Sequence, residues 1–243
     1  GPELSVLAVT DGVDFALLKL RDEYLVDRPG FARSARAVLR TFGDDALHRV
    51  VVIGADGHVT YNSLGEGVGT YLGDRDHVRF HVGDGADRLY VSKPLFGRVA
   101  EVWSVLMTRA IRRDGKVAGV VVIVLTPEYL AAQMAGVTLS PEDVVVLLQA
   151  DGTFLSRTPD WRSVMGKTVA ADRPFLAAGA ADRGVFRAPA STDKTPRIFA
   201  WHRDPSTGLL AVVGLSEAAL FAPIDAEIAR GRRRTVAIVV LML

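Results

Sequence analysis

Two stretches of the chain share one pattern, in which an apolar run leads into Asp-Gly and an alternating apolar and polar run follows. Residues 51–63 read VVIGADGHVTYNS, and residues 145–157 read VVLLQADGTFLSR. Asp-Gly between two strand-like runs predicts a hairpin, because glycine adopts a positive φ without steric cost. The two Asp-Gly pairs are 95 positions apart, which suggests a repeated unit.

Two further dipeptides recur at almost the same spacing. Asp74-Arg75 and Asp172-Arg173 are 98 positions apart, and Asp87-Arg88 and Asp182-Arg183 are 95 apart. The recurrence predicts two units of roughly 95 residues, each the size of a small domain. Both dipeptides are common, so a single larger domain with chance matches is the alternative.

The hydrophobic pattern predicts a strand-rich fold in both units. Strand-like runs in the first unit are 49–54, 58–63, 88–96, 101–111 and 117–125, with a short helix within 74–84. Those in the second unit are 143–149, 153–158, 184–189, 197–203 and 208–216. We therefore expect an α+β fold with two tandem PAS-like modules, each a mostly five-stranded antiparallel sheet with helices on one side.

Helical spacing dominates residues 1–46, which we expect to form an N-terminal helical segment. In its first helix Phe15, Leu18 and Leu25 share one face. Pro29-Gly30 should separate this helix from a second, whose apolar positions are Phe31, Ala35, Val38, Leu39 and Phe42. Thr126 is the expected N-cap of a helix that follows the first unit.

The end of the sequence changes abruptly from basic to apolar. Four arginines lie within Arg230–Arg234, and nine uncharged residues follow. Because a membrane helix needs about 20 apolar residues, we expect residues 223–243 to lead into a transmembrane segment that the sequence contains only in part. Basic clusters usually flank the cytoplasmic side of such helices, so the side on which this cluster lies is an open question.

Composition excludes some classes of function. The net charge is +1, which gives no electrostatic reason to expect nucleic-acid binding. The sequence has no cysteine, which rules out disulfides and thiol catalysis. There is no P-loop, dinucleotide fingerprint or nucleophile elbow, so no cofactor is expected. The glycine-rich residues 65–73 follow a strand but open no clear helix, unlike a phosphate-binding loop.

Residues 73–130 contain the motifs DRDHVRFH, LYVSKPLFGRVAEVWSVLMTRAI and RDGKVAGVVVIVLTPEYL. With these motifs the stretch resembles the extracytoplasmic double Cache (PDC-type) sensor domains of bacterial receptors, most closely those of diguanylate cyclases and histidine kinases. The matching residues are Asp74, Arg75, Arg79, His81, Ser92, Pro94, Gly97, Arg98, Trp103, Arg109, Asp114, Gly115, Ala118 and Gly119. Only Arg75 matches the residues of the amino-acid-binding branch, which argues against an α-amino acid as ligand.

The resemblance implies a periplasmic sensing region of an inner-membrane receptor that binds a small molecule and is not itself an enzyme. The full-length receptor would be a homodimer. Residues 47–130 would be the membrane-distal, ligand-binding module, and residues 131–222 the membrane-proximal module. The signal would pass through the membrane to a cytoplasmic output domain, a cyclase or a kinase.

Strand alternation suggests which side chains form the ligand site. Tyr90 and Ser92 share one strand face, and Trp103 and Arg109 share another. If both faces line one cavity with Arg75 and His81, the site has aromatic walls and guanidinium groups that suit a carboxylate or a phosphate. The alternatives are a core role for Trp103, a solvated strand end for Arg109 and a structural bond for Arg75.

A metal-dependent hydrolase is the competing hypothesis. His77 and His81 have the i, i+4 spacing that can hold a metal on a helix, and Asp74 and Asp76 are close in sequence. No third remote ligand is evident, so we expect no metal site. On this interpretation His81 belongs to the ligand pocket and His77 lies at the surface.

Overall fold

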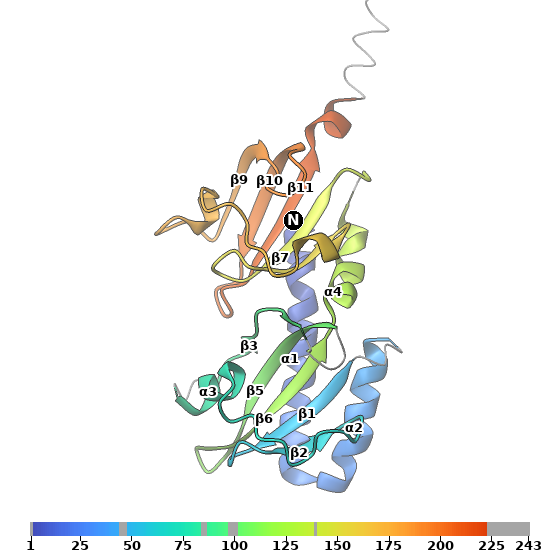
Figure 1. Ribbon diagram of the computed structural model, residues 1–243, viewed down its shortest axis with the longest axis vertical. Coiled ribbons are helices and arrows are strands. Elements are labelled where there is room, and N and C mark those ends of the chain that lie inside the picture. The colour runs from blue at the N-terminus through green and yellow to red at the C-terminus, as the bar shows by residue number, and fades with distance from the viewer. Residues whose placement is uncertain (1, 44–47, 84–86, 97–101, 139, 223–243) are drawn as a thin grey trace, which may run out of the picture.

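The computed structural model describes residues 2–43, 48–83, 87–96, 102–138 and 140–222. Two antiparallel sheets are stacked end to end beside one long N-terminal helix, α1 (Figure 1). This arrangement confirms the predicted α+β fold with two tandem PAS-like modules. We call the sheet of β1 to β6 with its helices the first module, and the sheet of β7 to β11 the second module.

The first sheet has six strands, in the order β2-β1-β6-β5-β3, with β4 paired to β5. The hydrophobic pattern predicts five, with residues 88–96 as one strand, but Pro94 lacks an N–H for the ladder and separates two short strands. The elements are α1 (Pro2–Val26), α2 (Arg28–Thr41), β1 (Arg49–Gly54), β2 (Val59–Asn62), α3 (Asp76–Gly83), β3 (Tyr90–Val91), β4 (Leu95–Phe96), β5 (Trp103–Arg113) and β6 (Lys116–Leu125).

The second sheet has five strands, in the order β8-β7-β11-β10-β9. These strands are β7 (Val144–Leu148), β8 (Phe154–Thr158), β9 (Arg183–Pro189), β10 (Pro196–Arg203) and β11 (Leu210–Ser216). The helices of this part of the chain are α4 (Pro127–Met134) and three short 3-10 helices at Ala135–Val137, Trp161–Val164 and Pro174–Leu176. Thr126 caps α4 as predicted, because its Oγ1 accepts a hydrogen bond from the N–H of Tyr129 at 3.2 Å.

The two Asp-Gly hairpins are present and closely alike. Gly57 lies between β1 and β2 with φ +81°, and Gly152 lies between β7 and β8 with φ +83°. Both hairpins also shift register by a bulge at the end of the first strand. Since only glycine takes this φ without strain, the repeated dipeptide marks the same turn in each module.

α1 packs against both sheets and joins their cores. Its buried side chains include Val13, Leu17, Leu20 and Tyr24. They belong to one hydrophobic cluster with β5 and β6 of the first module and with β7 and β11 of the second. The predicted apolar face was wrong, because Phe15 is 72% exposed. The buried face is the one that can reach two sheets at once, which the sequence of the helix alone does not reveal.

Two further details of the helices differ from the expectation. The break between α1 and α2 is at Asp27, whose Oδ1 accepts a hydrogen bond from the N–H of Gly30 at 3.0 Å. Pro29 lies inside the first turn of α2, where no intrahelical N–H is needed. The helices of the first module also lie on both faces of its sheet, since α1 covers one face and α3 packs on the other.

The two modules contact each other directly. Gln149 donates from Nε2 to the backbone oxygen of Val91 at 2.7 Å, and Lys93 forms an ion pair with Asp151 at 2.6 Å. Residues 223–243, which include the basic cluster and the expected start of a membrane segment, lie outside the described residues. Within the described ranges, none of the helices has the length and apolarity that a bilayer crossing requires.

Candidate functional site

A hollow lies on the face of the first sheet that turns away from α1. It holds about 1540 Å³, counted out to the open solvent at its mouth. Strand alternation builds its floor, because every second side chain of β1, β5 and β6 points to this face while the others enter the core with α1. The floor residues are Val51, Ile53, Leu106, Val122 and Val124. We call this space the first hollow.

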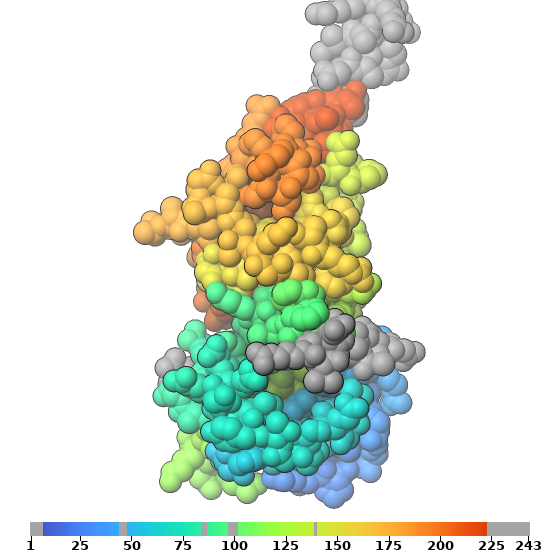
Figure 2. Space-filling view, viewed as in Figure 1, coloured from blue at the N-terminus to red at the C-terminus, as the bar shows by residue number. Residues whose placement is uncertain are grey.

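The segment between β2 and α3 forms one wall of the first hollow. It runs back along the first hairpin, with hydrogen bonds from the N–H of Val59 to the oxygen of Thr70 at 2.9 Å and from the N–H of Leu72 to the oxygen of Gly57 at 2.8 Å. Thr70 and Leu72 then line the hollow. Figure 2 shows this segment, in cyan, on the front of the first module.

Two arginines bring positive charge to the rim. Arg49 begins β1, and Arg75 directly precedes α3. Neither guanidinium forms an ion pair with any part of the chain that the structure describes. Glu66 supplies one carboxylate to the same lining, and Asn62, Thr70 and Ser104 supply neutral polar groups. The lining therefore carries one excess positive charge over an apolar floor, which suits an anion with an apolar body.

His77 also lines the first hollow. Burial lowers its pKa to about 4, and the charge of Arg75 acts in the same direction. The side chain is therefore a neutral hydrogen-bonding group at pH 7. The expectation that His77 lies at the surface was wrong, because both histidines of α3 point from one helix face toward the sheet.

Of the six residues predicted to bind ligand, only Arg75 lines the first hollow. Three others lie nearby, between α3 and the sheet or on the adjoining strand. His81 is buried, and its Nε2 lies 2.8 Å from Oγ1 of Thr108. Tyr90, half-buried, pairs with Thr108 across the sheet. Ser92 is buried and accepts a hydrogen bond at Oγ from a backbone N–H of β5 at 2.9 Å. These contacts hold α3 and β3 in place.

The remaining two, Arg109 and Trp103, lie elsewhere. Arg109 points toward α1, where its Nε and Nη2 donate to the two carboxylate oxygens of Asp14, each at 2.6 Å, and Nη1 donates to the backbone oxygen of Asp87 at 2.8 Å. Asp14 raises the pKa of Arg109. Trp103 packs on Phe96 at 5.2 Å between ring centroids and against the core of the second module. The two strand faces therefore do not converge on one cavity.

The hydrolase hypothesis finds no supporting geometry. No group of three or more His, Asp or Glu side chains that could hold a metal ion occurs within the described ranges. Burial lowers the pKa of His81 to about 4, and its Nε2 is already engaged by Thr108. Asp74 and Asp76 are exposed, so α3 does not assemble the four residues into one site.

Most of the lining was not identified from the sequence. The glycine-rich residues 65–73 do not form a phosphate loop but contribute four members to the lining of the first hollow, Glu66, Gly67, Thr70 and Leu72. The available signal for the floor was the spacing of Val122 and Val124, which are two positions apart on one strand and therefore share a face. No sequence pattern singled out Arg49, because it lines the first hollow only through its position at the start of β1.

Comparison with known proteins places the fold among sensor domains. No protein-family model and no curated protein matches the sequence. The extracellular domain of rpHK1S-Z16, a protein described as a histidine kinase, has a similar structure with a TM-score of 0.72 and 23% identity, over 87% of this chain and 88% of that one.

Two chemoreceptor domains of Pseudomonas are similar as well. The ligand-binding domain of CtaA from Pseudomonas fluorescens, in complex with L-isoleucine, has a TM-score of 0.64 and 14% identity, over 91% of this chain and 90% of that one. The domain of PctB from Pseudomonas aeruginosa PAO1, in complex with L-Arg, has a TM-score of 0.65 and 16% identity, over 90% and 92%. These likenesses confirm the predicted resemblance at the level of the fold. None of the three concerns a diguanylate cyclase, so that link stays a prediction.

Proposed function

We propose that this chain is the extracytoplasmic sensing region of a bacterial membrane receptor, and that it binds a small carboxylate in the first hollow. Residues 47–130 would form the membrane-distal module and residues 131–222 the membrane-proximal one. The observation that carries the proposal is the pair of arginines, Arg49 and Arg75, without an ion-pair partner in the described chain above an aliphatic floor. The fold shared with receptor domains supports a binding role rather than catalysis.

The ligand we propose is a monocarboxylate with a branched aliphatic body. Its carboxylate would accept charge-assisted hydrogen bonds from Arg75 or Arg49, and its body would cover the valines of β1 and β6. The first hollow is large enough to admit a ligand of this size. We include no α-amino group in the ligand, because the lining has little to bind one. Its single carboxylate, that of Glu66, belongs to an exposed side chain.

Signalling would use the contacts between the modules. A ligand changes the output only if it binds two conformations with different affinity. α1 packs on both sheets, and Gln149 and Lys93 join the modules beside it. A shift of the first sheet on ligand binding would therefore be passed to β11 and the residues that follow it. In the membrane we propose a homodimer whose output domain lies in the cytoplasm.

Calorimetry with 4-methylpentanoate, its neutral amide and L-leucine tests the proposed ligand class. We expect the acid to bind saturably, the amide to bind at least about tenfold more weakly, and Arg75→Gln to cause a similar loss, because a hydrogen bond to a charged group contributes about 1.5–3 kcal/mol. Arg79→Gln is the matched control, since Arg79 is exposed one helical turn away and does not line the first hollow.

Three outcomes would contradict the proposal. If folded wild-type protein binds neither the acid nor L-leucine, the first hollow is not a site for this class. Equal loss in the Arg75 and Arg79 variants would show that general charge, and not the site, attracts the ligand. A preference for L-leucine of more than about tenfold, abolished by Glu66→Gln, would replace the simple carboxylate by an amino acid.

A further inference from the structure

The second module contains a hollow in the position that corresponds to the first. It holds about 440 Å³, again counted out to solvent, on the face of its sheet that turns away from α1. The alternation of β7 repeats that of β1, because Val144, Val146 and Leu148 point into this space while Val145 and Leu147 enter the core with α1. We call this space the second hollow.

The repeat extends to the wall of the hollow. In the first module the N–H of Leu72 bonds the oxygen of Gly57 at 2.8 Å, and in the second the N–H of Val169 bonds the oxygen of Gly152 at 3.0 Å. Leu72 lines the first hollow and Val169 the second. In both modules an arginine follows a few residues later and enters the lining.

That arginine is Arg173, the counterpart of Arg75 in the repeated Asp-Arg pair. Its side chain is only 13% exposed, and its nearest carboxylate, Asp172, lies 3.5 Å away and is 78% exposed. One hydrogen bond, of 3.4 Å, joins Nη2 to the backbone oxygen of Pro189. A guanidinium in a largely apolar space with such weak partners has unused capacity for an anion.

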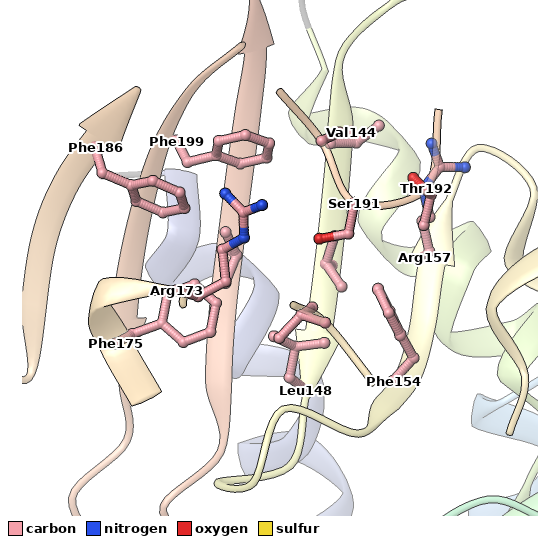
Figure 3. A pocket seen from close by; sticks show the side chains of 14 residues that line it. Val144, Leu148, Phe154, Arg157, Arg173, Phe175, Phe186, Ser191, Thr192 and Phe199 are labelled. Atoms are coloured by element: carbon pink, nitrogen blue, oxygen red, sulfur yellow. The ribbon is translucent and has the colours of Figure 1, made fainter. Parts of the chain in front are cut away.

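Phenylalanine rings form much of the surrounding wall (Figure 3). Phe186 and Phe199 stack with their centroids 5.0 Å apart, Phe175 lies 5.9 Å from Phe186, and the guanidinium of Arg173 is 5.7 Å from the centroid of Phe186. Phe154 borders the space from β8. These rings offer flat apolar surfaces to a ring or a short branched chain.

The opposite rim adds further positive charge. Arg157 lines the second hollow. Its guanidinium and that of Arg197 both donate to the carboxylate of Asp193, at 3.0 Å and 2.7 Å. One carboxylate thus serves two arginines whose side chains are 7% and 4% exposed. Together with Arg173, the described surroundings have more buried positive charge than negative charge.

From these observations we propose that the second module holds an independent binding site for a small monocarboxylate with an aromatic or branched body. The carboxylate would bond Arg173, with Ser191 at the rim as a further donor, and the body would contact the phenylalanines. The smaller volume selects a smaller ligand than the first hollow takes. A receptor of this form would bind two different compounds, one in each module of the same chain.

Benzoate, with benzamide as its neutral isostere, tests this site in the intact chain. We expect saturable binding of benzoate by calorimetry, with benzamide at least about tenfold weaker and Arg173→Gln weaker by a similar factor. One matched control should bind as the wild type does: Arg183→Gln, an exposed arginine of β9. Val169→Phe, which fills the second hollow from its half-exposed wall, should abolish binding without loss of the fold.

Methyl NMR of the wild type gives a readout that no variant can obscure, because benzoate should shift the methyl signals of Val144, Val146 and Val212, all of which line the second hollow. The proposal is overturned if neither benzoate nor 3-methylbutanoate binds at about 10 mM, ten times the Kd of a millimolar complex. It is equally overturned if Val169→Phe binds normally, or if Arg75→Gln, and not Arg173→Gln, removes the binding. If Arg173→Gln does not fold, the Val169 variant and the methyl shifts decide.

Discussion

Replacing Arg109 by methionine separates a structural role from a ligand-binding role. The side chains of Arg109 and Asp14 are 13% and 24% exposed, and two hydrogen bonds of 2.6 Å join them. Breaking a buried pair by removing one partner costs about 3–5 kcal/mol. Because the carboxylate of Asp14 keeps part of its contact with water, we expect Arg109→Met to lower the free energy of unfolding by about 2–3 kcal/mol.

Urea denaturation followed by circular dichroism measures this loss. The midpoint should fall while the m-value stays constant, and the melting temperature should drop by about 5–10 °C for a chain of this size. Arg113→Met is the matched control, because Arg113 ends the same strand and is exposed; its effect should stay within about 0.5 kcal/mol. The double variant with Asp14→Asn should recover part of the loss.

Binding of 4-methylpentanoate should be unchanged in Arg109→Met, because Arg109 does not line the first hollow. A folded variant that keeps its wild-type stability but no longer binds the acid would refute this reasoning. It would mean that Arg109 reaches ligand as the sequence pattern suggested, and that the contact with Asp14 contributes little to folding.

Three other predictions concern packing and pH. Gly119→Ala should destabilise the chain by more than about 2 kcal/mol in urea denaturation, because its Cβ would lie 2.5 Å from the backbone oxygen of Ile53; wild-type stability would argue against that register. Hydrogen bonds from Arg197 lower the pKa of Asp193 from 3.8 to about 2, so the unfolded chain binds the proton more readily and stability is lost as pH falls from about 4 to 2. Asp193→Asn should flatten that part of the stability curve, and an unchanged slope would contradict the assignment. Burial lowers the pKa of His81 from 6.5 to about 4, so stability present above pH 6.5 should decline toward pH 4; His81→Gln, which retains a partner for Thr108, should reduce the slope, and an equal slope would count against it.

The parts of the fold that depend on local chemistry were predictable. Asp56-Gly57 and Asp151-Gly152 determine their hairpins within a few residues, and Thr126 caps its helix through a bond three residues away. The strands followed from short runs of apolar residues, which alternate with polar ones in strands such as β2 and are continuous in strands such as β7. The repeat of these local signals was enough to predict two modules.

The site was less predictable, because its geometry depends on partners far away in sequence. Arg109 forms its ion pair with Asp14, which lies 95 positions away in the sequence. No local sequence pattern at either residue predicts this contact. Alternation correctly grouped Trp103 with Arg109 but could not say whether that face meets a helix or a hollow. Phe15 shows the same limit, since the buried stripe of α1 is chosen by two sheets that come later in the chain.

The position of α1 has a consequence for the order of assembly during synthesis. This helix is made before either sheet, yet its buried apolar side chains also pack with those of β11, which ends at Ser216. During synthesis the apolar face of α1 therefore lacks part of its packing partners until some 200 further residues have been made. One face of the second sheet is covered by α1, since Val145, Leu147, Ala211 and Val213 share a hydrophobic cluster with it. Disruption of the buried face of α1 would therefore affect the second sheet as much as the first.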